Sequence, residues 1–246
     1  MIPVLRQQQI LEFIKEKGSV SLSEVVKKIG ISESTIRRDL KELEQQGFVD
    51  LYRGGGICVK GGEIELELDE KMVLHKEEKD RIARYAASLV YPHDVIFLDP
   101  SSANHLMIDY LPTDNITVVT NSIAHINKLV KRQITCLLIG GEIKRTTSSC
   151  IGPIAEDTIA NLRFSKCFLG ANGMSVKYGL TNHDVRERII KRVAIASSVA
   201  TYFLVDASKY GTIAKCKVAD IDEYAIITDR AITEMEGMEN IFVASE

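Results

Sequence analysis

Two capped helical patterns that meet at a single glycine, near the start of the chain, restrict the possible folds more than any other feature. The first pattern begins at Ser21, whose hydroxyl can cap a helix with Glu24 as the partner residue of a capping box. Gly30 can supply the left-handed stop of that helix. Ser32 then caps a second helix that runs to about Gln46. Two short helices joined by so tight a turn predict a helix-turn-helix.

The second of these helices has two different sides. Ile36, Leu40 and Leu43 fall on one side and can pack into a core. The opposite side carries hydroxyl and cationic side chains, namely Ser34, Thr35, Arg37, Arg38 and Lys41. A solvated charged face is the plainer reading of such a pattern. Because hydroxyls and arginines gather at the N-terminal end of a capped helix, we predict that these residues contact DNA in the major groove.

Short apolar runs follow this helix on both sides of Gly54-Gly55-Gly56 and predict a β-hairpin. After a helix-turn-helix, such a hairpin is a wing, and Arg53 at its tip can reach a phosphate or the minor groove. A flexible glycine linker is the alternative. Together with a helix expected at Leu5–Lys17, the pattern predicts a DNA-binding domain over residues 1–59, a connection over 60–72 and a larger domain over 73–246.

The larger domain alternates apolar, β-branched runs with amphipathic stretches, which predicts a mostly parallel sheet covered by helices on both faces. Helices are expected near residues 76–90, 102–111, 122–132, 153–163 and 184–199. The expected strands are Val95–Leu98, Ile116–Val119, Cys136–Ile139, Cys167–Leu169, Tyr202–Val205 and Ala225–Ile227. The fold class is therefore α/β, with a small helical domain in front.

Small and polar residues follow each of these strands, where open α/β sheets bind their ligands. Any one group of them can be a plain helix cap, but six at one sheet edge predict a small-molecule pocket. The candidate ligand-binding residues are Asp99, Ser101, Ser102, Thr120, Asn121, Gly140, Gly141, Asp206 and Lys209. Hydroxyls and N–H groups at a helix start, with a lysine, suit an anionic phosphate, and carboxylate and amide groups suit sugar hydroxyls.

Composition narrows the setting in which such a protein works. The chain has 31 Lys and Arg against 34 Asp and Glu, a net charge of -3. DNA affinity must then come from a local patch, and we expect a homodimer or homotetramer that doubles it. The sequence has no long apolar run and no secretory leader, and its five cysteines are scattered, so we expect a cytoplasmic protein with no membrane contact and no disulfide framework. No spacing of histidines or cysteines indicates a metal site.

The run Thr35-Ile36-Arg37-Arg38-Asp39-Leu40, followed by Arg53 and glycines, resembles the winged helix-turn-helix of the DeoR family of bacterial sugar-metabolism repressors. Later motifs extend the resemblance over nearly the whole chain: Asp99-x-Ser-Ser, Val119-Thr120-Asn121, Gly140-Gly141, Phe168-Leu169-Gly170, Gly179-Leu180-Thr181 and Asp206-x-Ser208-Lys209. Pro100-Ser101-Ser102 departs from the family's small residue, glycine and threonine.

The resemblance implies a regulator, expected to be a repressor, of a carbohydrate-metabolism operon, with operator DNA and a sugar phosphate as partners. It also implies a sensor domain similar to ribose-5-phosphate isomerase, no cofactor, and ligand contacts from Gly179 and Thr181. The alternative is a sugar-phosphate isomerase or CoA-transferase-like enzyme with a fused DNA-binding domain. Asp99, Glu142, Asp206 and Lys209 are its candidate acid–base groups, but no catalytic motif accompanies them. We therefore expect a protein that is not an enzyme.

Overall fold

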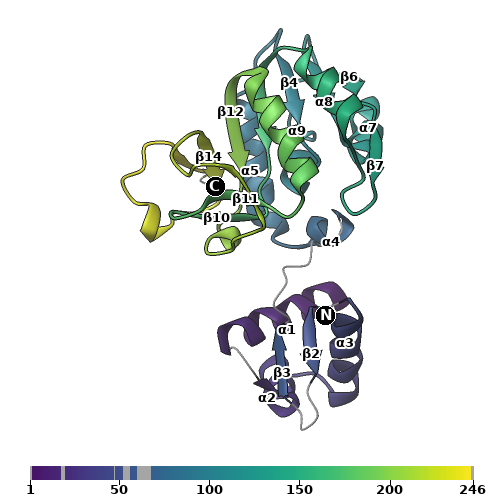
Figure 1. The fold of residues 1–246 in the computed structure, drawn as a ribbon, viewed down its shortest axis with the longest axis vertical. Coiled ribbons are helices and arrows are strands. Elements are labelled where there is room, and N and C mark those ends of the chain that lie inside the picture. The colour runs from purple at the N-terminus through teal and green to yellow at the C-terminus, as the bar shows by residue number, and fades with distance from the viewer. Residues whose placement is uncertain (1, 18–19, 47, 52–55, 60–67, 245–246) are drawn as a thin grey trace. The chain divides into compact units, whose positions relative to one another are not determined.

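The computed structural model describes residues 2–17, 20–46, 48–51, 56–59 and 68–244. The chain forms two compact units, Met1–Leu66 and Glu67–Glu246, and each has hydrophobic core residues of its own (Figure 1). The predicted connection over residues 60–72 spans the division between them. Its last residues belong to the helix α4 (Leu68–Val73), and Leu68 is buried in the larger unit.

The smaller unit is a winged helix-turn-helix, as predicted. Its elements in chain order are α1 (Pro3–Lys17), β1 (Val20–Ser21), α2 (Leu22–Ile29), α3 (Glu33–Gln45), β2 (Val49–Leu51) and β3 (Gly56–Val59). The strands β2 and β3 pair as an antiparallel hairpin, and β1 adds to the outer side of β3. Ile10 and Ile14 of α1, Val25 of α2 and Ile36 of α3 meet in one core. The apolar residues whose helical spacing predicted three packed helices therefore form the core of this unit.

The ends of α2 and the start of α3 were predicted from three capping features, and two of the three are present. Ser21 and Glu24 form the predicted capping box, and Gly30 takes a left-handed conformation with φ 71°. Ser32 precedes α3 in the N-cap position, but its side chain caps no backbone N–H. Its hydroxyl lies instead 2.9 Å from the hydroxyl of Thr35. The prediction that the Ser32 side chain caps the helix was therefore wrong, because a neighbouring hydroxyl competes for it.

The larger unit is built on a seven-stranded, fully parallel sheet with the strand order β15-β14-β12-β9-β4-β5-β6. All six strands expected from the sequence are present and adjacent. The strands are β4 (Val95–Leu98), β5 (Thr117–Thr120), β6 (Thr135–Leu138), β9 (Phe164–Leu169), β12 (Ser198–Leu204), β14 (Ala225–Thr228) and β15 (Ile241–Val243). Because they run in one direction, the polar residues that follow them gather at one edge.

Helices cover both faces of this sheet, as the sequence predicts (Figure 1). Ile96 and Leu98 of β4 face one core, and Phe97 between them faces the other, which is the alternation expected of a strand. The first core is closed by α5 (Lys76–Ser88), α6 (Ser102–Met107) and α7 (Ile123–Lys131). The second is closed by α8 (Pro153–Ala160) and α9 (Val185–Ala196).

Besides β1 and the edge strand β15, five short antiparallel strands were not expected from the sequence. They are β7 (Glu142–Lys144), β8 (Ser149–Ile151), β10 (Gly173–Ser175), β11 (Gly179–Asn182) and β13 (Cys216–Ala219). The first two form a hairpin, and the other three form an antiparallel sheet. They have three or four residues each and lie between longer elements, so no alternation long enough to indicate a strand appears in the sequence.

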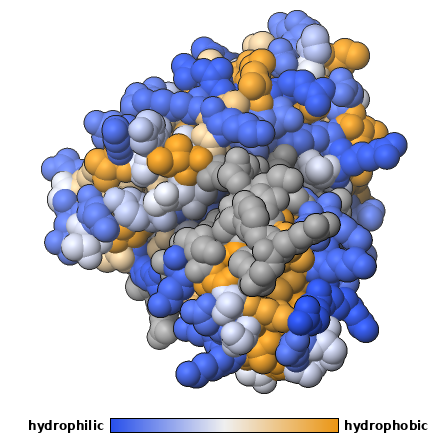
Figure 2. All heavy atoms as spheres, turned by 60° about the horizontal axis from the view of Figure 1, so that its bottom comes forward, coloured by the Kyte–Doolittle hydropathy of each residue, from blue (hydrophilic) through white to orange (hydrophobic). Residues whose placement is uncertain are grey.

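Over the part of the chain that the structure describes, no helix is long and apolar enough to cross a membrane. Hydrophilic side chains predominate on the face drawn in Figure 2, and hydrophobic ones form separate patches there. The same described residues include no group of three or more His, Cys, Asp or Glu side chains that could hold a metal ion.

Candidate functional site: a recognition helix and a polar pocket

The helix α3 separates its side chains as the sequence predicts. Ile36, Leu40 and Leu43 are buried against α1 and α2. Ser34, Arg37, Arg38 and Lys41 are exposed, and Thr35 is partly exposed. The candidate DNA-contacting side chains thus share the solvent side of one helix whose other side is packed.

The cationic side chains on this helix differ in whether they already have an acidic partner. Arg37 is held by Glu33 one turn earlier, with Nε 2.9 Å and Nη2 2.8 Å from the carboxylate. Arg38 and Lys41 have no acidic partner among the described residues. Arg38 and Lys41 can therefore meet a phosphate or a base edge without first breaking an ion pair.

A buried ion pair, not expected from the sequence, sets the position of α3. Asp39 is 1% exposed and accepts two hydrogen bonds from Arg6 of α1, from Nε at 2.5 Å and from Nη2 at 2.8 Å. The hydrogen bond to Asp39 raises the pKa of Arg6. Gln7 adds a second link to α3, because its Nε2 donates to Glu42 at 2.7 Å. Such a two-pronged contact fixes the rotation of α3 about its own axis.

The wing is present as the hairpin of β2 and β3, in which Leu51 pairs with Ile57 and Val49 with Val59. Arg53, the candidate contact at its tip, lies outside the described residues.

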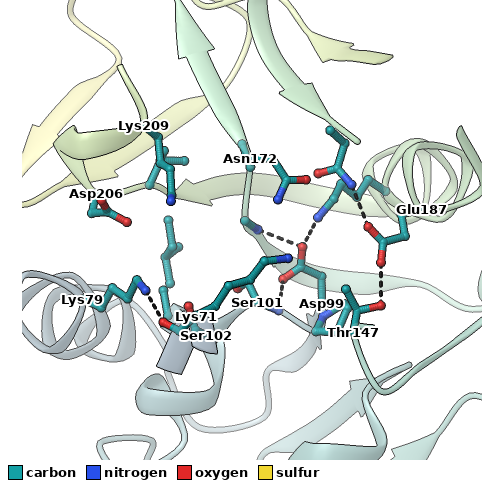
Figure 3. A pocket seen from close by; sticks show the side chains of 18 residues that line it. Lys71, Lys79, Asp99, Ser101, Ser102, Thr147, Asn172, Glu187, Asp206 and Lys209 are labelled. Atoms are coloured by element: carbon teal, nitrogen blue, oxygen red, sulfur yellow. Dashed lines mark hydrogen bonds and ion pairs between the residues drawn. The ribbon is translucent and has the colours of Figure 1, made fainter. Parts of the chain in front are cut away.

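The larger unit contains a pocket at the carboxyl edge of the parallel sheet, with a volume of about 70 Å³. Figure 3 shows polar side chains converging on it from several elements. The charged residues that line it are Lys71, Lys79, Asp99, Glu187, Lys191, Asp206 and Lys209, four lysines against three carboxylates. Of the residues expected from the sequence, Asp99, Ser101, Ser102, Asp206 and Lys209 line the pocket.

Asp99, at the end of β4, is the centre of the pocket floor and is fully buried. Its Oδ2 accepts from the Gly170 amide at 2.8 Å and forms an ion pair with Lys191 of α9. Its Oδ1 accepts from the Ser101 amide at 3.0 Å and from Asn104 Nδ2 at 2.8 Å. Four donors occupy both oxygens, so Asp99 organises the floor and has little capacity left for a sugar hydroxyl.

The start of α6 presents unused hydrogen-bond donors to the pocket. The Ser101 hydroxyl caps the helix by accepting from the Asn104 amide at 3.3 Å. No acceptor within the described residues meets the backbone N–H groups of Ser102 and Ala103. Pro100 removes one amide from this loop, but the two free N–H groups after it still point to an anion as the natural partner.

A cationic cluster forms another side of the pocket, where Lys79, Asp206 and Lys209 are seen together in Figure 3. Lys79 is 4% exposed, and its ammonium donates to the carbonyls of Lys71 at 2.5 Å and Leu74 at 2.7 Å. Burial lowers the pKa of Lys79 to about 8. The Lys209 side chain, which is partly exposed, has no hydrogen-bond partner within the described residues.

Asp206 is the one carboxylate among these cations. Burial alone would raise its pKa, but the charges of Lys209 and Lys79 and a hydrogen bond from Ser208 outweigh that effect and lower the pKa of Asp206. Asp206 thus faces two lysines of the pocket lining, Lys79 and Lys209, and this side of the pocket carries more positive than negative charge.

The opposite side of the pocket is held by Glu187 of α9. Its carboxylate accepts from Thr147 Oγ1 at 2.7 Å and from Asn182 Nδ2 at 2.8 Å, and Lys144 Nζ lies 3.2 Å away. These contacts join α9 to the β7–β8 hairpin and to β11. Asn172 reaches the pocket beside them, and its Oδ1 accepts from the His183 amide at 3.2 Å, which leaves its NH₂ group for a ligand.

Four of the candidate residues, at the ends of β5 and β6, lie outside the pocket lining. The Thr120 hydroxyl donates to the Leu98 carbonyl at 2.7 Å, and Asn121 Nδ2 donates to the Cys150 carbonyl at 2.9 Å. At Gly141, a Cβ atom would lie 2.7 Å from the Ile151 carbonyl oxygen. Thr120, Asn121 and Gly141 thus make or allow close contacts with the backbone, while Gly140 is exposed and a Cβ atom there would meet nothing within 4 Å.

Gly179 and Thr181, in and beside β11, also lie outside the lining. Gly179 has φ 72°, and a Cβ atom there would lie 2.2 Å from the Ala219 carbonyl oxygen. Thr181 is 2% exposed, and its hydroxyl accepts from the Ala214 amide at 2.9 Å. Both residues shape the β10–β11–β13 sheet, and the pocket does not bring them together with Asp99 and Lys209.

Three lysines of the pocket were missed in the sequence, namely Lys71, Lys79 and Lys191. A signal for two of them was present. Lys79 is one turn before the buried Ile82, and Lys191 lies beside Ile190 on the buried side of α9. A lysine within the apolar stripe of an amphipathic helix is costly to bury unless it has a partner or a function, and it is a candidate for that reason.

Comparison with known proteins agrees with the division of the chain into a helix-turn-helix unit and a larger unit. A family model described as a DeoR-like helix-turn-helix domain matches residues 6–60, and one described as a DeoR C terminal sensor domain matches residues 74–230. The chain is 36% identical over 232 residues to the uncharacterized HTH-type transcriptional regulator FruR of Bacillus subtilis, covering 94% of this chain and 92% of that protein.

It is also 30% identical over 243 residues to the lactose phosphotransferase system repressor of Staphylococcus epidermidis, covering 96% of this chain and 95% of that protein. Among solved structures, ribose 5-phosphate isomerase A from Methanocaldococcus jannaschii matches with a TM-score of 0.40 and 17% identity, covering 55% of this chain and 54% of that chain.

Proposed function

Because this chain belongs to the DeoR family of helix-turn-helix transcriptional regulators, we propose that it represses a carbohydrate-metabolism operon and that a sugar phosphate in the larger unit controls its operator binding. The observation that carries the proposal is that one chain contains both features. The smaller unit has a helix with exposed cationic side chains, and the larger unit has a pocket lined by lysines. A protein that binds operator DNA acts in the cytoplasm, and the proposal includes this location.

The DNA contacts are assigned to the exposed side of α3. Arg38 and Lys41, which lack an acidic partner, take base edges or phosphates, and Ser34 and Thr35 add hydroxyl contacts at the N-terminal end of the helix. Arg37 joins them by exchanging Glu33 for a phosphate. Arg53 is assigned to the wing tip by the sequence alone. One such helix on a chain of net charge -3 binds weakly, so the regulator works as a homodimer or homotetramer.

The phosphate of the effector is assigned to the start of α6 and the lysines near it. The free N–H groups of Ser102 and Ala103 provide hydrogen bonds, and Lys79 and Lys209 provide more positive charge than Asp206 balances. The free NH₂ group of Asn172 suits a sugar hydroxyl on the opposite side. Asp99 and Lys191 hold the floor and do not contact the ligand directly.

Regulation follows from the size of this pocket. A volume of about 70 Å³ accommodates a phosphate group more readily than a whole sugar phosphate, since ligand pockets measure about 300–1,000 Å³. A sugar phosphate that places its phosphate there contacts several lining elements at once, and α4, which carries Lys71, is the lining helix nearest in sequence to the DNA-binding unit. The ligand shifts operator affinity to the extent that it binds the DNA-bound and DNA-free proteins unequally.

One observation favours a second candidate function, a sugar-phosphate isomerase or CoA-transferase-like enzyme. Lys79 has a pKa of about 8 in a buried site, which is suitable for acid–base chemistry. Against this candidate, Asp99 is fully hydrogen-bonded, and Glu142 is exposed, paired with Arg186 and outside the pocket. Steady turnover of a pentose or hexose phosphate that stops in the Lys79→Met variant would favour the enzyme.

The proposal is tested by measuring operator binding with and without a panel of sugar phosphates, using fluorescence anisotropy. Thermal shift first selects the sugar phosphates that bind, because a ligand stabilises the folded state whatever it does to DNA. Lys209→Met should leave operator binding intact and remove the ligand response, whereas Lys215→Met, an exposed lysine outside the pocket, should change neither. If no sugar phosphate alters operator binding, the proposed effector class is wrong.

A further inference from the structure

A second hollow lies on the outside of the larger unit, away from the pocket residues. It is an open groove of about 470 Å³ between the end of α8 and the helix α9. Its lining residues are Ala160, Arg163, Arg188, Ile189, Arg192, Val193, Ala196 and Ser197. Three arginines thus stand over a floor of small and aliphatic side chains, and no acidic residue lines this groove, which is called the arginine groove below.

Each of these arginines is anchored to the backbone. Arg163 Nη1 donates to the Ala196 carbonyl at 3.2 Å, Arg188 Nε to the Lys217 carbonyl at 2.5 Å, and Arg192 Nη1 to the Val218 carbonyl at 3.0 Å. None of the three forms an ion pair with a carboxylate of the described residues. Because part of each guanidinium is already fixed, the remaining N–H donors are pre-organised for carboxylates that the described part of one copy does not supply.

The same unit carries a matching set of unpaired acids. The acidic loop, residues 233–239 between β14 and β15, contains Glu234, Glu236 and Glu239. All three side chains are exposed, and none has a cationic partner among the described residues. The loop is not loosely attached, because Met235 within it is 3% exposed and packs into the second core.

The groove and the loop lie on the same face of the parallel sheet. Met235 of the loop belongs to the core that contains Ile190 and Ala194 of α9, on the opposite side of the sheet from α5 and α6. Three unpaired arginines and three unpaired glutamates on one face form a surface that is complementary to itself. Self-complementarity of this kind is what a twofold-symmetric dimer requires of its interface.

We propose that the arginine groove of one copy binds the acidic loop of a second copy, and that the reciprocal contact forms at the same time about a twofold axis. The occupant is a second copy of this chain, because its acidic loop matches the groove in charge and in number of charged groups. The aliphatic floor, with Ile189 and Val193, adds apolar contact beneath the ion pairs. This dimer contact goes beyond the proposed function and does not depend on DNA or on a ligand.

The test is a charge swap measured by analytical ultracentrifugation of the full chain. A groove variant carries Arg188→Glu and Arg192→Glu, and a loop variant carries Glu234→Arg, Glu236→Arg and Glu239→Arg. In either variant alone, both contacts of this interface would join like charges, so each variant should sediment with half of the wild-type mass. In an equimolar mixture, both contacts join opposite charges again, so a heterodimer should form and should weaken as salt is added.

The controls separate a lost interface from a lost fold. Arg186→Glu reverses a charge on the same helix outside the groove and should leave the dimer intact. The loop variant leaves the backbone anchors of the arginines untouched, so it remains informative if the groove variant misfolds by circular dichroism. A folded variant of either kind that keeps the wild-type mass overturns the proposal, whatever happens to DNA binding. A mixture of the two folded variants that does not regain the wild-type mass overturns it as well.

Discussion

Replacement of Lys79 by methionine tests the electrostatics of the pocket most directly. Lys79 is 4% exposed, and burial lowers its pKa from 10.5 to about 8. A lysine whose pKa is lower in the folded state than in the unfolded state carries a charge that opposes folding. The penalty is fully present below pH 8, where both states are charged, and disappears above pH 10.5, where both are neutral.

The size of the effect follows from the two pKa values. One pKa unit corresponds to about 1.4 kcal/mol, so the charge on Lys79 costs about 3 kcal/mol of folding free energy at pH 7. At pH 10 the same difference leaves a cost of about 1 kcal/mol. The stability of the Lys79→Met variant relative to the wild type should therefore fall by about 2 kcal/mol between pH 7 and pH 10. The lost hydrogen bonds to the carbonyls of Lys71 and Leu74 contribute nearly equally at both pH values.

The measurement is denaturant unfolding of both proteins at pH 7 and at pH 10, followed by far-UV circular dichroism. Taking the difference between variant and wild type cancels the titration of groups that do not interact with Lys79. A difference that is the same at both pH values would refute the reasoning. A ligand assay provides an independent check: affinity for a sugar phosphate should decline above pH 8 in the wild type and lose that decline in the variant, since the phosphate itself is fully ionised there.

Three further perturbations probe other parts of the molecule. Arg38→Ala should weaken binding to the cognate operator by about 1–3 kcal/mol in fluorescence anisotropy, and an equal loss on unrelated DNA would count against a base contact. Asp39→Ala removes the carboxylate that accepts two hydrogen bonds from Arg6 and should destabilise the smaller unit by about 1–3 kcal/mol in a denaturant titration; an unchanged midpoint would mean that this ion pair does not hold α3. Ser102→Glu places a carboxylate where the phosphate is proposed and should abolish ligand binding by calorimetry with operator binding retained; undiminished ligand binding would move the phosphate elsewhere.

The local parts of this fold could be predicted because local residues cause them. The capping box of Ser21 and Glu24 and the left-handed Gly30 involve neighbours in the chain. The strand Val95–Leu98 has the bounds read from its apolar run. The five short antiparallel strands could not be predicted, since their pairing depends on contacts between segments that carry no pattern of their own.

The candidate site residues show the same difference between local and long-range causes. Asp99, Ser101, Ser102, Asp206 and Lys209 follow strands and were found by their position. Thr120, Asn121, Gly141, Gly179 and Thr181 follow or begin strands as well, but the structure uses them for backbone contacts. Position in the sequence identifies the edge of a sheet, and it does not tell which residues at that edge remain free.

By itself, the sequence determined the winged helix-turn-helix, the parallel sheet and the edge at which the pocket lies, since periodicity, capping and strand direction are local properties. Tertiary structure alone decided which side chains meet. Lys191 reaches Asp99 across 92 positions of the chain, and Arg6 reaches Asp39 across 33. Such pairs form because burial leaves a charged group no water and requires a partner, and the packing of distant elements determines which partner is within reach.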